Sequence, residues 1–162
     1  DYHPDHRYTG ILVQDAAFMV TVPYFCPDTP HLTKNPVFLY ASDRFQKPYA
    51  FQADVAVSVD DVFEQKIDAI TELVSQTFEG GAGGNHELIR QIPQDPAGQR
   101  EWLKQRWVKR QSDEANLYRD ALISLYGQER GKSVKYAEAF EICEYGHQPS
   151  AEELKKLFPF FD

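Results

Sequence analysis

Apolar residues recur at helical spacing near the start of the chain. The pattern predicts an amphipathic helix over residues 4–20 with one buried side. Pro4 suits the first turn of such a helix, and Asp5 suits its positive end. A loop rich in Pro, Thr, Asp and Asn follows over residues 21–36. The expected buried stripe of the helix consists of Tyr8, Ile11, Leu12, Ala16 and Met19.

Two short apolar runs predict strands. Residues 37–41 form a nearly continuous apolar run, which is typical of a strand buried on both faces. Residues 54–59 place Val55, Val57 and Val59 on one face of a second strand. A helix beginning at Asp60–Asp61 follows and reaches about residue 78. A strand that leads directly into a helix indicates an α/β layered fold.

The second half of the chain begins with a glycine-rich stretch. The segment from Glu79 to Asn85 follows a helix and lacks the Lys-Ser/Thr pair of phosphate-binding loops. A mobile surface loop is therefore favoured over nucleotide binding. A long helix is expected from Asp95–Pro96 to about Tyr126, ended by Gly127. This helix carries a basic cluster formed by Lys104, Arg106, Lys109 and Arg110. A solvent-exposed helix face is favoured for this cluster over an anion-binding site.

A third strand over residues 139–145 and a short final helix complete the expected elements. Ser150 and Glu153 form a capping box at the start of that helix. The apolar tail after it, with Phe158, Phe160 and Phe161, is expected to dock on its own domain rather than on a partner.

Composition narrows the class of protein. Hydrophobic residues make up 42% and charged residues 26%, which is typical of a soluble globular chain. The net charge of −8 argues against binding to nucleic acid. There is no apolar run long enough to predict a membrane span, and the cytoplasm is the default expectation. Cys26 and Cys143 are expected to be buried free thiols. The aromatic content of 14% fits a packed core or a carbohydrate-facing cleft.

The chain opens with Asp1-Tyr2-His3-Pro4-Asp5-His6-Arg7. Histidines three residues apart at a helix start point to one side of a turn. Neutral imidazoles are good zinc ligands, and an acid such as Asp5 would hold the second ring proton. On its spacing alone, this pair is more often two helix-start histidines without a metal.

The whole string is more specific than its spacing. It resembles the second signature of the PIG-L/LmbE-like zinc-dependent N-deacetylases. Residues 55–76 resemble the strand-then-helix block of that family, with Lys66, Ala69 and Ser75-Gln76 in register. Residues 136–146 resemble its closing strand region. Leu73 stands where the block often has a histidine, and the family's first signature, of the His-Pro-Asp-Asp-Glu type, is absent.

The resemblance implies a Rossmann-like α/β fold with a largely parallel sheet, here missing its N-terminal strands. Residues 1–162 would be the C-terminal part of a single deacetylase domain, with a flexible loop at 79–99 and a tail at 148–162. The missing N-terminal part of the domain would supply the first signature, because its ligands and general base are needed for turnover. The isolated chain is accordingly expected to bind zinc weakly and to lack deacetylase activity.

The resemblance also implies roles for individual residues. His6 matches a zinc ligand, and His3 matches a second active-site histidine that stabilises the oxyanion or protonates the leaving amine. Asp5 would tune that histidine. The expected reaction releases acetate and a free amine from a small N-acetylglucosamine-containing substrate. Candidate sugar contacts, each with an alternative as a loop or packing residue, are Asp43, Arg44, Tyr49 and Glu138, with Ser42 and Tyr136 beside them.

Two other functions stay open at this point. The first is a non-catalytic relative, or an inactive fragment, that binds a sugar or a protein partner. The second is a metal site unrelated to hydrolysis, in which a remote carboxylate joins His3 and His6. A homo-oligomer is compatible with either.

Overall fold

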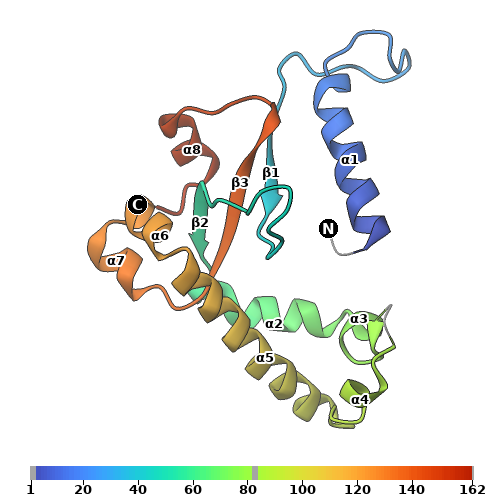
Figure 1. The fold of residues 1–162 in the computed structure, drawn as a ribbon, viewed down its shortest axis with the longest axis vertical. Coiled ribbons are helices and arrows are strands. Elements are labelled where there is room, and N and C mark those ends of the chain that lie inside the picture. The colour runs from blue at the N-terminus through green and yellow to red at the C-terminus, as the bar shows by residue number, and fades with distance from the viewer. Residues whose placement is uncertain (1–2, 82–83, 162) are drawn as a thin grey trace. The chain divides into compact units, whose positions relative to one another are not determined.

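The computed structural model describes residues 3–81 and 84–161. Helices account for 51% of the structure, and the strands form one small sheet (Figure 1). The strands are β1 (Val37–Ala41), β2 (Val55–Ser58) and β3 (Ala137–Gly146). The helices are α1 (Pro4–Met19), α2 (Phe63–Thr71), α3 (Val74–Thr77), α4 (His86–Ile89), α5 (Pro96–Leu117), α6 (Arg119–Tyr126), α7 (Gln128–Ser133) and α8 (Ala151–Leu157), with a 3-10 turn at Asp60–Val62.

The sheet is antiparallel, so the expected Rossmann-like fold with a largely parallel sheet is wrong. Its strand order is β1-β3-β2, and β3 pairs antiparallel with β1, placing Leu39 opposite Ile142 and Ala41 opposite Phe140. Strands before and after a helix can run either way, so the strand-then-helix order does not fix the direction of the last strand. β1 is an edge strand of half-buried residues ending in the exposed Ala41, which corrects the expectation of burial on both faces.

The chain divides into two compact units. The first contains the residues up to Ala56 and those from Ala139 on; the second contains Val57–Glu138. α1, β1 and α8 belong to the first unit, and α2 to α7 belong to the second.

The core of the second unit lies between α2 and α5. Phe63 and Ile67 of α2 and Leu103 of α5 are buried there. The ring of Tyr136 stacks on Phe63 with centroids 4.1 Å apart. Lys66 forms an ion pair with Glu138, and its Nζ lies 4.9 Å from the ring centroid of Trp107. Removal of apolar surface from water is the main stabilising term in this unit.

Two expected long helices are interrupted. The helix expected over about residues 61–78 is the 3-10 turn, α2 and α3, with a break at Glu72 and Leu73. The helix expected over 96–126 is α5 and α6, separated at Tyr118, whose φ and ψ are −105° and 29°. Gly127 ends α6 with a φ of +81°, as expected. The short helix α7 that follows is not indicated by the sequence pattern.

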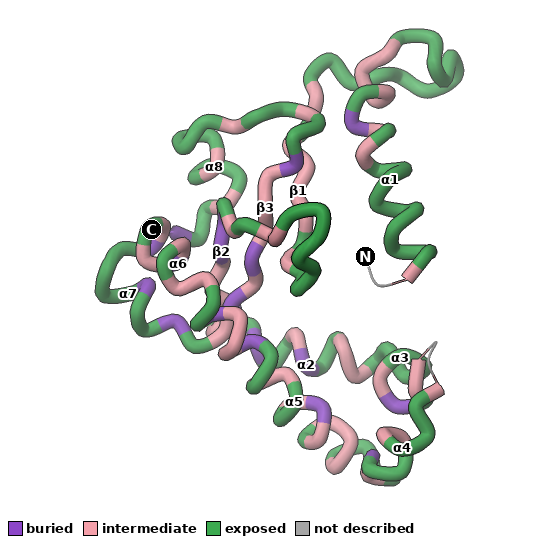
Figure 2. The backbone as a smooth tube through the Cα atoms, in the orientation of Figure 1, coloured by how far each residue is buried: buried purple, intermediate pink, exposed green. Residues whose placement is uncertain are grey.

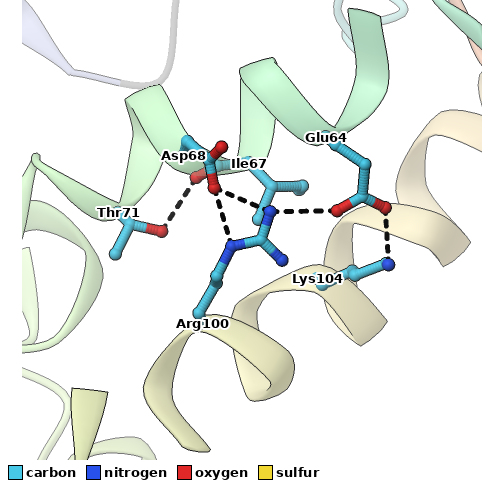
Figure 3. A network of polar contacts seen from close by, with 6 residues as sticks. All are labelled: Glu64, Ile67, Asp68, Thr71, Arg100 and Lys104. Carbon is cyan, nitrogen blue, oxygen red and sulfur yellow. Dashed lines mark hydrogen bonds and ion pairs between the residues drawn. The ribbon is translucent and has the colours of Figure 1, made fainter. Parts of the chain in front are cut away.

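A polar network joins α2 to α5 on the solvent side of the same unit (Figure 3). Arg100 donates from Nε to Asp68 at 2.7 Å and from Nη2 to Glu64 at 2.9 Å. Lys104 contacts the second oxygen of Glu64 at 2.5 Å. Hydrogen bonds from Lys104 and Arg100 hold the pKa of the Glu64 carboxyl below its ordinary value.

The first unit confirms the expected C-terminal elements. β3 covers the predicted strand, and Ser150 and Glu153 make both bonds of the capping box at the start of α8. The ring of Phe158 lies 6.3 Å from Phe140 of β3 and 6.2 Å from the buried Phe161. Phe158 and Phe161 of the tail therefore dock on their own unit, whereas Phe160 is 53% exposed.

The apolar stripe of α1 is not buried in the described structure. The side chains of Tyr8, Ile11 and Leu12 are 62%, 44% and 66% exposed, and Ala17 is the buried residue of the helix. Figure 2 shows α1 exposed over most of its length. Across residues 3–81 and 84–161, no helix combines the length and apolar character needed to cross a lipid bilayer.

Gly131 and Gly10 provide a matched pair for testing packing. A Cβ on Gly131 would lie 2.5 Å from the Cα of Ile123 in α6, whereas a Cβ on Gly10 of α1 would meet nothing within 4 Å. We expect Gly131→Ala to lower the free energy of unfolding by about 1–3 kcal/mol through overpacking. Gly10→Ala should raise it by about 0.5–1 kcal/mol, because alanine favours helix. Urea unfolding followed by circular dichroism measures both; equal effects would contradict the close α6–α7 contact.

The Arg100 network should stabilise the protein in a salt- and pH-dependent way. Arg100→Met is expected to lower stability slightly at low salt, with the loss fading at high salt because solvent-exposed ion pairs are screened. The Glu64 pKa is lowered in the folded state. The ionised Glu64 carboxylate therefore makes its full contribution to the free energy of unfolding above the ordinary pKa of 4.5. This contribution disappears as the pH falls through the lowered pKa of the folded state. Arg106→Met is the control, because Arg106 lies 4.8 Å over Trp102 rather than beside a carboxylate. Thermal melts across salt and pH would refute the expectation if both variants responded alike.

Candidate functional site

His3 begins the helix that carries the motif. It is the N-cap of α1, with extended backbone angles of −129° and 144°, and its Nδ1 accepts a hydrogen bond from the Asp5 amide at 3.2 Å. The nearest Asp5 carboxylate oxygen lies 3.7 Å from Nδ1, which is longer than a hydrogen bond. Because Nδ1 accepts, the neutral ring carries its proton on Nε2.

His3 and His6 lie close together without the geometry of two ligands on one ion. Their ring centroids are 6.3 Å apart and the rings are inclined at 77°. Two imidazoles on one tetrahedral zinc, each with a Zn–N distance of about 2.0–2.1 Å, would have centroids about 5 Å apart.

His6 lines a pocket of about 480 Å³ in the first unit. Two of the expected sugar contacts, Asp43 and Tyr49, line the same pocket. The loop between β1 and β2 carries both of them, and the amide of Phe45 donates to Asp43 Oδ1 at 3.0 Å. The aromatic rings of Phe45 and Phe51 complete the apolar part of the wall. Such a mixture of aromatic faces and a few polar groups is typical of a small-molecule site.

The other expected site residues lie elsewhere. The lining formed by the described residues does not include His3, Asp5, Arg44 or Glu138. Glu138 belongs to the second unit, where Lys66 neutralises it. Tyr136 is a packing residue stacked on Phe63.

Sequence reasoning missed Glu141, Gln14 and Tyr40, which also line the pocket. Glu141 Oε2 accepts a hydrogen bond from the Gln52 amide at 2.9 Å, so β3 holds the strand-connecting loop through this carboxylate. The available signal was weak. Glu141 lies within the segment that resembles the family's final strand region, but the face of the sheet to which it belongs could not be known before the pairing of β3 with β1.

Two of the lining residues, Gln14 and Tyr40, belong to a hydrogen-bond cluster. The Tyr40 hydroxyl accepts from Gln14 Nε2 at 2.7 Å and from the Cys143 thiol at 3.0 Å, and it donates to Glu144 Oε2 at 3.4 Å. Burial raises the pKa of the Tyr40 phenol, and the negative charge of Glu144 raises it further. The charge of Glu144 also raises the pKa of the Tyr49 phenol. Both hydroxyls therefore stay protonated and act as neutral groups.

A larger cavity of about 820 Å³ lies along the C-terminal half of α1 and the following loop. Its lining is mostly apolar, and it contains neither motif histidine. Cys26 lines it and is exposed, which corrects the expectation of two buried thiols; Cys143 is buried as expected. The smaller pocket is the better candidate site, because its lining brings the motif residue His6 together with Asp43 and Glu141.

The described residues alone do not fit a catalytic zinc site. Such a site takes three protein ligands and keeps one position open, and no group of three His, Cys, Asp or Glu side chains with suitable geometry occurs in residues 3–81 and 84–161. Asp1, the first residue of the motif, lies outside the described residues. His6 is consequently at most one member of a ligand set.

Comparison with models of protein families, with curated proteins and with solved structures gives no match to this chain. The resemblance to the deacetylases therefore rests on the sequence motifs alone.

Proposed function

We propose that this chain carries the histidine side of a zinc-dependent N-deacetylase site. The intact protein would remove the acetyl group of a small, N-acetylglucosamine-containing substrate and release acetate and a free amine. The observation that carries the proposal is the meeting of His6 with Asp43 and Tyr49 at one pocket. The motif points to His6, and the loop after β1 carries Asp43 and Tyr49.

The chemistry of the pocket suits a sugar ring. A pyranose presents apolar C–H faces and polar hydroxyl edges. The rings of Tyr49, Phe45 and Phe51 provide apolar surface, and the carboxylates of Asp43 and Glu141 accept hydrogen bonds from hydroxyl groups. These groups support binding and orientation of the substrate next to the motif helix.

The two histidines would have separate roles. His6, at the pocket, would be a metal ligand. His3 would act through the proton on Nε2, because its Nδ1 already accepts from the Asp5 amide. An N–H donor of this kind stabilises the negative charge that develops on the amide oxygen during hydrolysis. Asp5 supports this role through its backbone.

No catalytic step is assigned to the isolated chain, because the described residues do not complete the ligand set. The remaining ligands and the general base would be those of the family's first signature. The isolated 162-residue chain is accordingly expected to bind zinc weakly and to show no turnover.

A sugar-binding relative without catalysis is the second candidate. The described residues form the aromatic and acidic pocket but contain no group of three metal donors. Binding of an N-acetylglucosamine conjugate by the full gene product, without acetate release and without zinc, would favour this alternative.

The first test replaces His6 in the full gene product. We expect the unmodified protein to carry about one zinc per chain. His6→Ala should lower zinc affinity by at least about 100-fold, because even residues behind the ligands contribute 10–100-fold. Release of acetate from an N-acetylglucosamine conjugate should be lost. His86→Ala is the matched control, since His86 is an exposed histidine of α4 in the second unit. Unchanged zinc content and turnover in His6→Ala would refute the proposal.

The second test separates the proposed catalytic role of His3 from its role as the N-cap of α1. Asparagine is a good N-cap, so His3→Asn should leave the start of α1 intact. We expect zinc content to stay near that of the unmodified protein and kcat to fall by about 100- to 1,000-fold, as for other oxyanion donors. Metal analysis and steady-state kinetics measure the two effects. Loss of zinc together with activity would instead make His3 a ligand.

A further inference from the structure

The motif helix α1 has few packing anchors. Residues 4–13, which include the His6 end, are all exposed in the described structure, and only Ala17 near the other end is buried. Apolar burial, at Ala17 and at the half-buried Ala16 and Met19, lies in the C-terminal half of α1. An interaction closer to His6 adds to the orientation of that side chain.

Gln14 supplies that interaction. It is half-buried, and its side-chain amide donates to the Tyr40 hydroxyl at 2.7 Å. Gln14 is two turns along α1 from His6, and both side chains line the same pocket. Because an α-helix rotates and translates as a rigid element over two turns, about 12 Å, the bond at Gln14 also orients His6.

Tyr40 is half-buried and takes part in three side-chain hydrogen bonds. Its hydroxyl uses the full capacity of such a group: it accepts from Gln14 and Cys143 and donates to Glu144. Tyr40 lies on β1, and Cys143 and Glu144 lie on the neighbouring strand β3. The cluster connects the motif helix to the sheet at a single oxygen atom.

We infer that Tyr40 is a positioning residue: acting through Gln14, it holds α1 in the orientation that presents His6 to the pocket. The expected effect of Tyr40 on kcat rests on the proposed function, whereas its effect on the orientation of α1 does not. A misplacement of about 1 Å in a catalytic group can lower a rate by 100-fold. Loss of one hydroxyl in this cluster is therefore expected to affect kcat more than substrate binding.

The experiment is a double-mutant cycle in the full gene product. Tyr40→Phe removes only the hydroxyl, and Gln14→Met keeps the length and helix preference of the side chain. We expect each variant to lower kcat about tenfold with KM within about twofold, and the double variant to lose no more than either alone, since both break one interaction. Tyr24→Phe is the control for loss of a hydroxyl, because Tyr24 is 89% exposed on the loop after α1.

Hydrogen exchange gives a second readout that needs no activity. Tyr40→Phe and Gln14→Met should raise the exchange rates of the α1 amides about tenfold, while those of β1 and β3 stay the same. If the unmodified protein shows no turnover, the proposed function fails and the exchange rates still decide the role of Tyr40. Unchanged α1 exchange overturns the inference, as does an unchanged kcat in an active enzyme. Additive losses of kcat in the double variant would show that the two residues act separately and would also overturn it.

Discussion

The pairing of β3 with β1 and β2 is the constraint on which most of the structure depends. β3 is the central strand, and the side chains along it reach several different features. Cys143 and Glu144 hold the Tyr40 hydroxyl, Phe140 receives the aromatic tail, and Glu138 pairs with Lys66. A strand slip of one residue would turn each of these side chains to the opposite face. The register of β3 therefore fixes the pocket wall, the docking of the tail and the Lys66 pair together.

Lys66 and Glu138 illustrate how a sequence resemblance and a structural role can differ. Both belong to the segments that resemble the deacetylase family, and Glu138 was a candidate sugar contact. In the structure they neutralise one another, with the Lys66 ammonium lying over the face of Trp107. A partly buried cation is stabilised by an acid and by an aromatic face. The ion pair and the contact with Trp107 account for the presence of Lys66 and Glu138 in the second unit without a bound ligand.

The candidate site draws on three elements of the first unit. Glu141 lies on β3, Asp43 and Tyr49 lie on the exposed loop between β1 and β2, and His6 lies on a helix with little apolar burial. A single helix of this length is marginal in water and depends on tertiary contacts for its stability. The polar bond between Gln14 and Tyr40 is consequently of greater importance here than the same bond in a well-packed core.

Most local elements could be predicted from the order of residues along the chain. Helical periodicity, the Gly127 stop, the Ser150 capping box and the three strands arise from interactions between residues close in the chain, and these are recorded in the pattern. The motif pointed to His6 and the run after the first strand to Asp43, and both residues line the pocket. The tertiary structure alone decided the strand directions, the interruption of two long helices, the exposure of the α1 stripe, and the presence of Glu141 and Tyr40 at the pocket. These features depend on contacts between residues up to about a hundred positions apart, and no local pattern specifies such contacts.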